Sequence, residues 1–316
     1  MAEVIAIGEL LIDFAGIGTD CEGYPTLKAQ PGGAPANYLA PLAKYGVSTA
    51  FIGKVGNDSF GRMLVKTLNN AGIDTSNTVL DDSYFTTLAF VTWDKNGDRE
   101  FSFARKPGAD TQLRFEEINL GMIDSCRVFH FGTLSLTDEP SRSATLGAVN
   151  YAKEQSKIIS FDPNYRAPLW ENEDEAKKQI KKGLELADVV KISDEEVDFV
   201  FGTTPEEGAD IILNHFGAKL VFVTLGSNGC FYSNGKASGY VPGLTGVKAV
   251  DTTGAGDIFG GSAMYGLLKT NKAPEVLNNE ELGRIAAFAV NVSGVSVTRL
   301  GGIPSVPELS EIATIT

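Results

Sequence analysis

A segment near the C-terminus, Asp251–Ser262, combines carboxylates with small residues at a spacing that could do chemistry. The tripeptide Gly254–Gly256 places unobstructed backbone N–H groups directly before Asp257, and an apolar run typical of a buried helix follows. The first N–H groups of a helix lack internal partners and carry the positive end of its dipole, which predicts an anion site. Asp257 fits a site that holds a phosphate and also accepts a proton. In the plainer interpretation, Asp257 caps its helix and the glycines form a turn.

A second glycine-rich stretch, Gln30–Asn37, lies near the N-terminus and precedes a helix-like run. Gly32 and Gly33 permit the backbone to approach a ligand closely. Asn37, in the first turn, could hydrogen-bond a hydroxyl group or cap the helix. Asp13 follows the first predicted strand, at the end where doubly wound sheets bind ligands, but taken alone it reads better as a solvated loop carboxylate.

Along the chain, short apolar runs alternate with helical segments, and these elements must position the residues named above. Such an alternation predicts a three-layer, doubly wound α/β fold with a mostly parallel sheet that is covered on both faces. The chain shows no internal repeat and no low-complexity linker, so we expect a single domain over residues 1–316. The expected strands are Val4–Ile7, Thr49–Ile52, Val128–Phe131, Ile158–Phe161, Val189–Ile192 and Leu220–Thr224, with short antiparallel strands at Cys230–Ser233 and Gly239–Val241.

One β-rich insertion interrupts the alternation. Thr86–Trp93 and Glu100–Phe103 flank a loop with Asn96-Gly97, a strong hairpin signal. Together with residues 14–30, the insertion at 84–105 is expected to form a small sheet that lies across the site as a lid. Arg105, at the exit of the hairpin, would then point back toward the cleft, or it is simply a surface charge.

Composition excludes several classes of protein. The net charge of −13 argues against a nucleic-acid binder, which needs a basic surface. Three scattered cysteines and two histidines predict neither structural disulfides nor a zinc site. The N-terminus has no basic region typical of a signal peptide, and no apolar run approaches the roughly 20 residues of a membrane span. We therefore expect a cytoplasmic protein without nucleic-acid or membrane partners.

The two glycine motifs together resemble the paired signatures of the ribokinase-like (PfkB) carbohydrate kinases, with a spacing that matches along essentially the whole chain. Within that family the chain looks most like fructokinase. Asp162–Arg166 is also similar to 2-keto-3-deoxygluconate kinases. The stretches that resemble fructokinase are Gly8–Phe14, His130–Leu136 and Asp162–Arg166.

The resemblance implies transfer of the γ-phosphoryl group of ATP to the 6-hydroxyl of fructose, with Asp257 as general base. It implies an anion hole from the N–H groups of Gly254, Ala255 and Gly256, and Mg²⁺ organised through water by Glu196. Ser193 stands where the family has Asn. The sugar positions are Asp13, Gly32, Gly33, Asn37, Arg105 and Arg166; the nucleotide positions are Ser193, Glu196, Thr224, Gly226, Gly229 and Asn291; those for a monovalent cation, usually K⁺, are Asp251, Thr253, Ser296, Arg299, Gly301 and Ser305.

Other interpretations stay open. A 2-keto-3-deoxygluconate kinase would need an extra cation for the substrate carboxylate, and Arg105 and Arg166 could supply it. Another ribokinase-family sugar kinase and a non-catalytic sugar- or nucleotide-binding regulator are further alternatives. A dehydrogenase is excluded because no G-x-G-x-x-G motif follows the first strand. Exposed lid strands also allow a homodimer.

Overall fold

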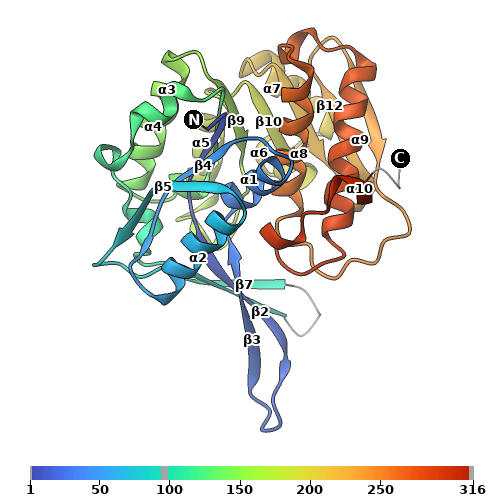
Figure 1. Cartoon of the computed structure of the whole chain (residues 1–316). Helices are drawn as coiled ribbons and strands as arrows, with labels where there is room; N and C mark the ends of the chain where they lie inside the picture. Colours follow the sequence, from blue (N-terminus) through green and yellow to red (C-terminus); the bar gives the residue numbers. More distant parts are fainter. Residues whose placement is uncertain (1, 94–98, 313–316) are drawn as a thin grey trace.

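A nine-stranded sheet runs through the computed structural model, which describes residues 2–93 and 99–312 (Figure 1). The expected strands are all present. In spatial order the sheet contains β13 (Ser238–Pro242), β12 (Gly229–Ser233), β11 (Leu220–Thr224), β10 (Val189–Ser193), β9 (Ile158–Asp162), β8 (Val128–Gly132), β1 (Val4–Ile7), β4 (Thr49–Gly56) and β5 (Ile73–Asp81).

The strands from β11 to β5 run parallel, whereas β12 and β13 are antiparallel and close one edge. In β1, Ile5 lies opposite both Ala50 on β4 and Phe129 on β8. Val4–Ile7 is completely buried because it has a neighbouring strand on each side and helices on both faces. The carboxyl ends of the parallel strands meet at one edge of the sheet, where such folds bind ligands.

Alternate residues of β1 enter two separate cores. Val4 and Ala6 pack with the helices on one face, and Ile5 and Ile7 with those on the other. This arrangement confirms the predicted three layers. The first face carries α1 (Ala34–Lys44), α2 (Ser59–Asn70), α8 (Ala255–Thr270), α9 (Asn279–Ser296) and α10 (Leu309–Ile312), and the second carries α3 (Leu120–Ser125), α4 (Ser141–Glu154), α5 (Glu173–Leu184), α6 (Asp194–Phe201) and α7 (Pro205–His215).

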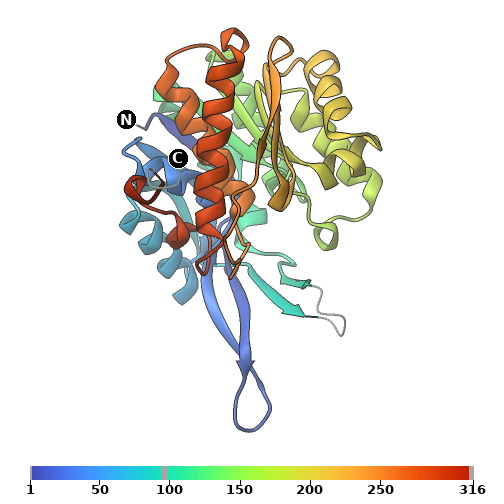
Figure 2. The ribbon, with the colours of Figure 1, turned by 90° about the vertical axis from the view of Figure 1, so that its right-hand side faces the viewer.

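The expected small sheet is also present, and its strand order is β3 (Pro25–Gly32), β2 (Leu11–Thr19), β6 (Leu88–Trp93) and β7 (Arg99–Ala104). The β2–β3 hairpin extends away from the body of the molecule in both views (Figures 1 and 2). Phe14 fastens this sheet to the body, because its ring stacks on Phe90 and meets the edge of Phe60 on α2. The predicted turn at residues 94–98 lies outside the described residues.

Sequence reasoning did not anticipate β5, α7 or the short helices α3 and α10. β5 lies at the edge of the main sheet and contains a continuous polar run, Asp74–Thr78, so it lacks the apolar run of the inner strands. α7 does carry a start signal, since Thr204 and Glu207 form a capping box at its N-terminus. Among the described helices, none is both long and apolar enough to cross a bilayer.

Candidate active site

A cavity of about 520 Å³ lies where the carboxyl ends of the parallel strands meet the small sheet. It is lined from four directions: by the small sheet, by the first turn of α1, by the loop after β9 and by the N-terminus of α8. The lining residues include Glu9, Asp13, Gly33, Asn37, Phe103, Leu134, Asn164, Arg166, Gly254 and Asp257. The two glycine motifs, more than two hundred residues apart, therefore line one cavity.

Asp257 lies in the first turn of α8 and is only 8% exposed. Its Oδ2 accepts a hydrogen bond from Nδ2 of Asn37 at 3.0 Å, and its Oδ1 accepts one from Nδ2 of Asn164 at 3.2 Å. Gly254 is the N-cap of α8, has a φ of 74°, and makes no side-chain capping bond. Asp257 is thus oriented by two amides and is not the helix cap, whereas Gly254 does form part of a turn, as the plainer interpretation expects.

Charged side chains surround Asp257. Burial raises the pKa of this carboxyl group, while the ammonium group of Lys191, the hydrogen bond from Asn37 and the charge of Arg166 act in the opposite direction. Lys191 forms an ion pair with Asp162 at 3.1 Å. A Cβ atom on Gly256 would lie 2.7 Å from Nζ of Lys191, so the ammonium group sits directly against the first turn of α8.

Two further carboxyl groups face the cavity. Burial raises the pKa of Asp13 to about 7, against the lowering effect of Arg166. Burial likewise raises the pKa of Glu9 to about 7, although its Oε1 accepts a 2.7 Å hydrogen bond from the N–H of Ala34. Gly33 has a φ of 120°, and a Cβ there would lie 2.5 Å from the carbonyl oxygen of Glu9. This position therefore requires glycine.

The neighbouring Gly32 is constrained by Asp13, since a Cβ atom on Gly32 would collide with the Asp13 carboxylate. Arg166 lines the cavity, and its Nη1 donates to the carbonyl oxygen of Tyr165 at 2.9 Å. The structure therefore brings together Asp13, Gly33, Asn37, Arg166, Gly254 and Asp257, with Gly32 directly behind Asp13.

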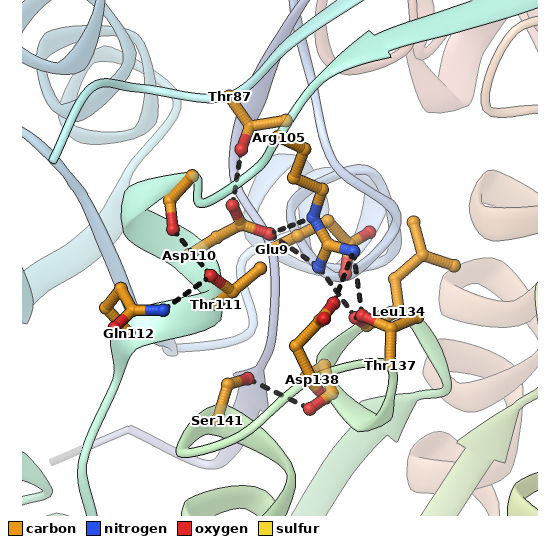
Figure 3. Close-up of polar contacts among 12 residues, drawn as sticks. Glu9, Thr87, Arg105, Asp110, Thr111, Gln112, Leu134, Thr137, Asp138 and Ser141 are labelled. Carbon is orange, nitrogen blue, oxygen red and sulfur yellow. Dashed lines mark hydrogen bonds and ion pairs between the residues drawn. The ribbon is translucent and has the colours of Figure 1, made fainter. Parts of the chain in front are cut away.

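Arg105 lies elsewhere than expected. The residue is 6% exposed and does not line the cavity, and its guanidinium group is bound by the body of the protein (Figure 3). Nε donates to Oδ2 of Asp110 at 2.8 Å, Nη1 to Oγ1 of Thr137 at 2.8 Å, and Nη2 to the carbonyl oxygen of Leu134 at 2.7 Å. The expected orientation toward the cleft is not found, because Asp110 offers a buried counter-charge.

Most of the proposed nucleotide residues lie at or just after the ends of β10 and β11. Ser193 and Glu196 form the capping box of α6, in which Oγ of Ser193 accepts from the N–H of Glu196 at 3.1 Å. The Glu196 carboxylate accepts from the N–H groups of Ser193 at 2.9 Å and Tyr165 at 2.7 Å. Thr224 pairs with Ser193 across the sheet. The remaining positions are Gly226 and Gly229, both with positive φ in the turn after β11, and Asn291 on α9.

Of the expected monovalent-cation residues, Thr253 and Gly301 contact Asp251. Its Oδ1 accepts from the N–H (2.9 Å) and hydroxyl (2.7 Å) of Thr253, and its Oδ2 accepts from the N–H of Gly301 at 2.9 Å. The side chain of Arg299 instead binds Glu311. The hydroxyls of Ser296 and Ser305 bond to backbone carbonyls of their own segments.

Sequence reasoning assigned no role to Glu9, Asn164, Asp162 or Lys191. The Asp162–Arg166 stretch was noticed as a motif, but its asparagine gave no separate signal. Asn164 has a positive φ of 49°, a conformation that asparagine tolerates better than most residues. Lys191 lies inside a buried strand, and only the structure shows that its side chain reaches α8.

Comparison with known proteins places the chain among sugar kinases. Residues 1–309 match the profile described as pfkB family carbohydrate kinase. The chain is 41% identical over 316 residues to fructokinase-2 of Solanum lycopersicum, covering 99% of this chain and 95% of that protein. It is 42% identical over 310 residues to the probable fructokinase-5 of Arabidopsis thaliana, covering 96% and 94%.

Solved structures agree with this placement. Fructokinase from Xylella fastidiosa with bound ATP has a TM-score of 0.90 at 32% identity, covering 100% of this chain and 98% of that one. A fructokinase double mutant from Vibrio cholerae with fructose, ADP and potassium ion has a TM-score of 0.87 at 31% identity, with the same coverage. The family expected from the two motifs is confirmed: this protein belongs to the pfkB family of carbohydrate kinases.

Proposed function

We propose that this protein is an ATP-dependent fructokinase that phosphorylates the 6-hydroxyl of fructose. The observation that carries the proposal is the position of Asp257, a buried carboxylate held by two amides at the N-terminus of α8 and facing a sugar-sized cavity. Relatives named fructokinase at about 41% identity along the chain support the choice of substrate. Solved relatives described with bound ATP, or with fructose and ADP, support the choice of both substrates.

The residues of the site account for the steps of such a transfer. Asp257 accepts the proton of the sugar hydroxyl as that oxygen attacks the γ-phosphorus. The N–H groups of Gly254, Ala255 and Gly256 stabilise the negative charge on the transferring phosphoryl group without reorganising. The arrangement fits a phosphate, because the first helical N–H groups have no intrahelical partner and no described side chain caps the α8 terminus. The N–H of Ala255 donates to the carbonyl oxygen of Thr252 at 3.2 Å, a bond that a phosphate oxygen would replace or share. The small sheet would exclude water from the cavity.

The residues also fit the proposed metal ions. Both oxygens of Glu196 already accept backbone hydrogen bonds, which suits contact with Mg²⁺ through water better than direct ligation. No cluster of three or more His, Cys, Asp or Glu suited to a metal occurs in residues 2–93 and 99–312. Mg²⁺ would therefore be held mainly by nucleotide phosphates, as it commonly is. Bound Mg²⁺ would neutralise charge on those phosphates.

Asp251 holds together the two loops that we expect to bind a monovalent cation. It ties Thr253 to Gly301 and so brings two backbone segments together beside the N-terminus of α8. We propose K⁺ as the cation at this place, with Asp251, Thr253, Ser296, Arg299, Gly301 and Ser305 around it. A relative described with potassium ion bound supports this choice.

The charges around the cavity favour a neutral sugar over 2-keto-3-deoxygluconate. Among the described residues, three carboxyl groups line the cavity, those of Glu9, Asp13 and Asp257. Arg166 is the single arginine or lysine among the described lining residues, and the guanidinium group of Arg105 is neutralised by Asp110. A carboxylate substrate would meet three acidic groups and one arginine, and the excess of acidic groups selects against it.

The test is a coupled assay of ADP release with fructose, ribose, adenosine and 2-keto-3-deoxygluconate. We expect ADP release that depends on sugar, with kcat/KM highest for fructose. No preference for fructose would overturn the choice of sugar. ADP release that does not respond to any sugar would favour the non-catalytic regulator.

We also propose a homodimer formed through the small sheet. Ile17 and Tyr24, on and beside the β2–β3 hairpin, are 58% and 63% exposed, which is unusual for large apolar side chains. Burial of this hairpin against a second copy would cover them. Light scattering should give twice the chain mass, and Ile17→Glu should give the monomer mass. A monomeric wild-type protein would refute the dimer without touching the kinase proposal.

A further inference from the structure

The two ends of the β6–β7 hairpin are fastened to the same carboxylate. Thr87 directly precedes β6, and Arg105 directly follows β7. Oγ1 of Thr87 donates to Oδ1 of Asp110, and Nε of Arg105 donates to Oδ2 at 2.8 Å, with Nη2 at 2.7 Å from the same oxygen (Figure 3). Asp110 belongs to a short 3₁₀ helix of the body, Ala109–Gln112. The carboxylate therefore holds both strands of the hairpin at their junction with the body.

This junction is dry and tightly packed. Thr87, Arg105 and Asp110 are 1%, 6% and 4% exposed, so water does not compete for their hydrogen bonds. A Cβ atom on Gly108 would collide with the hydroxyl of Thr87, which shows how closely the backbone passes the junction. Buried, charge-assisted hydrogen bonds of this kind are strong and directional.

The same guanidinium group also reaches the rim of the cavity. Nη2 of Arg105 donates to the carbonyl oxygen of Leu134, and Leu134 lines the cavity. Phe103, two residues before Arg105 on β7, lines the cavity from the small sheet. Glu9, another lining residue, lies close enough for the charge of Arg105 to lower its pKa against the effect of burial. Arg105 thus connects one wall of the cavity to another.

We propose that Asp110 and Arg105 are positioning residues for the sugar: they fix the β6–β7 hairpin to the body and thereby hold Phe103 over the cavity. The sugar is the ligand of this cavity in the proposed function, on which the inference rests. Arg105 itself does not contact the sugar. Loss of the junction weakens sugar binding, because Phe103 and Leu134 are no longer held in fixed relative positions, and leaves the reacting groups around Asp257 in place.

The experiment is a double-mutant cycle with Arg105→Met and Asp110→Asn, measured by ADP release. Each single variant should raise the KM for fructose by roughly 10- to 100-fold, the usual range of coupling between buried partners. The double variant should be no worse than either single variant. The kcat at saturating fructose and the KM for ATP should stay close to wild type.

Thr87→Val supplies a milder variant that tests the same junction. It removes one hydrogen bond to Asp110 and should raise the KM for fructose in the same direction. Thr145→Val is the matched control, because Thr145 is an equally buried threonine, in α4, whose hydroxyl has no hydrogen-bond partner among the described residues. Thermal unfolding of every variant shows whether it folds.

Additive effects of Arg105→Met and Asp110→Asn, or a normal KM in Asp110→Asn, would show that Arg105 touches the sugar directly and would overturn the inference. Equal KM values for Thr87→Val and Thr145→Val would also contradict it. Failure of the proposed function looks different, since wild-type protein would then release no ADP with fructose.

Discussion

Replacement of Asp257 by Asn separates catalysis from stability, because the structure gives its carboxylate a chemical task and no capping task. The amide keeps the shape of the side chain and one oxygen that can accept from Asn37 or Asn164. It cannot accept the proton of a sugar hydroxyl. Asp257→Asn is thus a cleaner perturbation than Asp257→Ala, which would leave the amide N–H groups of both asparagines without an acceptor.

The size of the effect follows from the role. General-base catalysis contributes about 10²- to 10⁴-fold, which corresponds to roughly 3 to 5 kcal/mol of activation free energy. The kcat of Asp257→Asn should fall by that factor, while the KM for fructose changes little. The folded state of Asp257→Asn should be more stable than that of wild type. Burial raises the pKa of Asp257, so the charged carboxylate destabilises the folded state above that pKa, and the neutral amide removes this cost at pH 8.

The assay pairs steady-state ADP release with thermal unfolding at pH 8. Asn172→Ala is the control, since Asn172 is a true helix cap that accepts from the N–H of Glu175 at 2.9 Å, on α5. We expect Asn172→Ala to lose about 0.5 to 2 kcal/mol of stability and to keep its kcat. The reasoning would be refuted if Asp257→Asn behaved in the same way, with a lower melting temperature and near-normal turnover.

Two other predictions concern the remaining carboxylates of the site. Burial raises the pKa of Asp13 from 3.8 to about 7, so the stability that its neutral form provides is lost as pH rises from about 4 through 7. The melting temperature of Asp13→Asn should therefore exceed that of wild type by more at pH 8 than at pH 5. The same variant should be nearly inactive on fructose. Asp251→Ala removes the hydrogen bonds that hold the loops at Thr253 and Gly301 together. The kcat of this variant should be the same in KCl as in the chloride salt of a large organic cation. If the variant still responded to K⁺ as wild type does, Asp251 would not belong to the cation site.

The sequence was sufficient for the layers of the fold because its central strands carry unbroken apolar runs, as in Val4–Ile7 and Leu220–Thr224. Those runs exist because both faces of the sheet are buried. β5 was missed for the complementary reason. It lies at the edge of the sheet, keeps polar residues such as Asn77 and Thr78, and so lacks the apolar run.

The site was predictable where the backbone itself imposes the residue type. Gly33 is required by its positive φ and by the carbonyl oxygen of Glu9, so it stands out in the sequence. Contacts between side chains that depend on tertiary packing left no comparable pattern in the sequence. Arg105 was expected in the cleft because it follows the hairpin, but the buried Asp110, five residues later, captures its guanidinium group. Nothing in the spacing distinguishes those two outcomes.

The glycines before Asp257 illustrate how one motif can satisfy two constraints. Gly254 adopts a positive φ at the helix N-cap, as a turn residue would. Gly256 instead makes room for Nζ of Lys191, which a side chain at this position would displace. The first turn of α8 therefore lies against the ammonium group of a side chain that is 12% exposed and that forms an ion pair with Asp162. Because Asp162 neutralises most of that charge, the affinity of this acidic chain for a phosphate group would rest mainly on the N–H groups and the dipole at the N-terminus of α8.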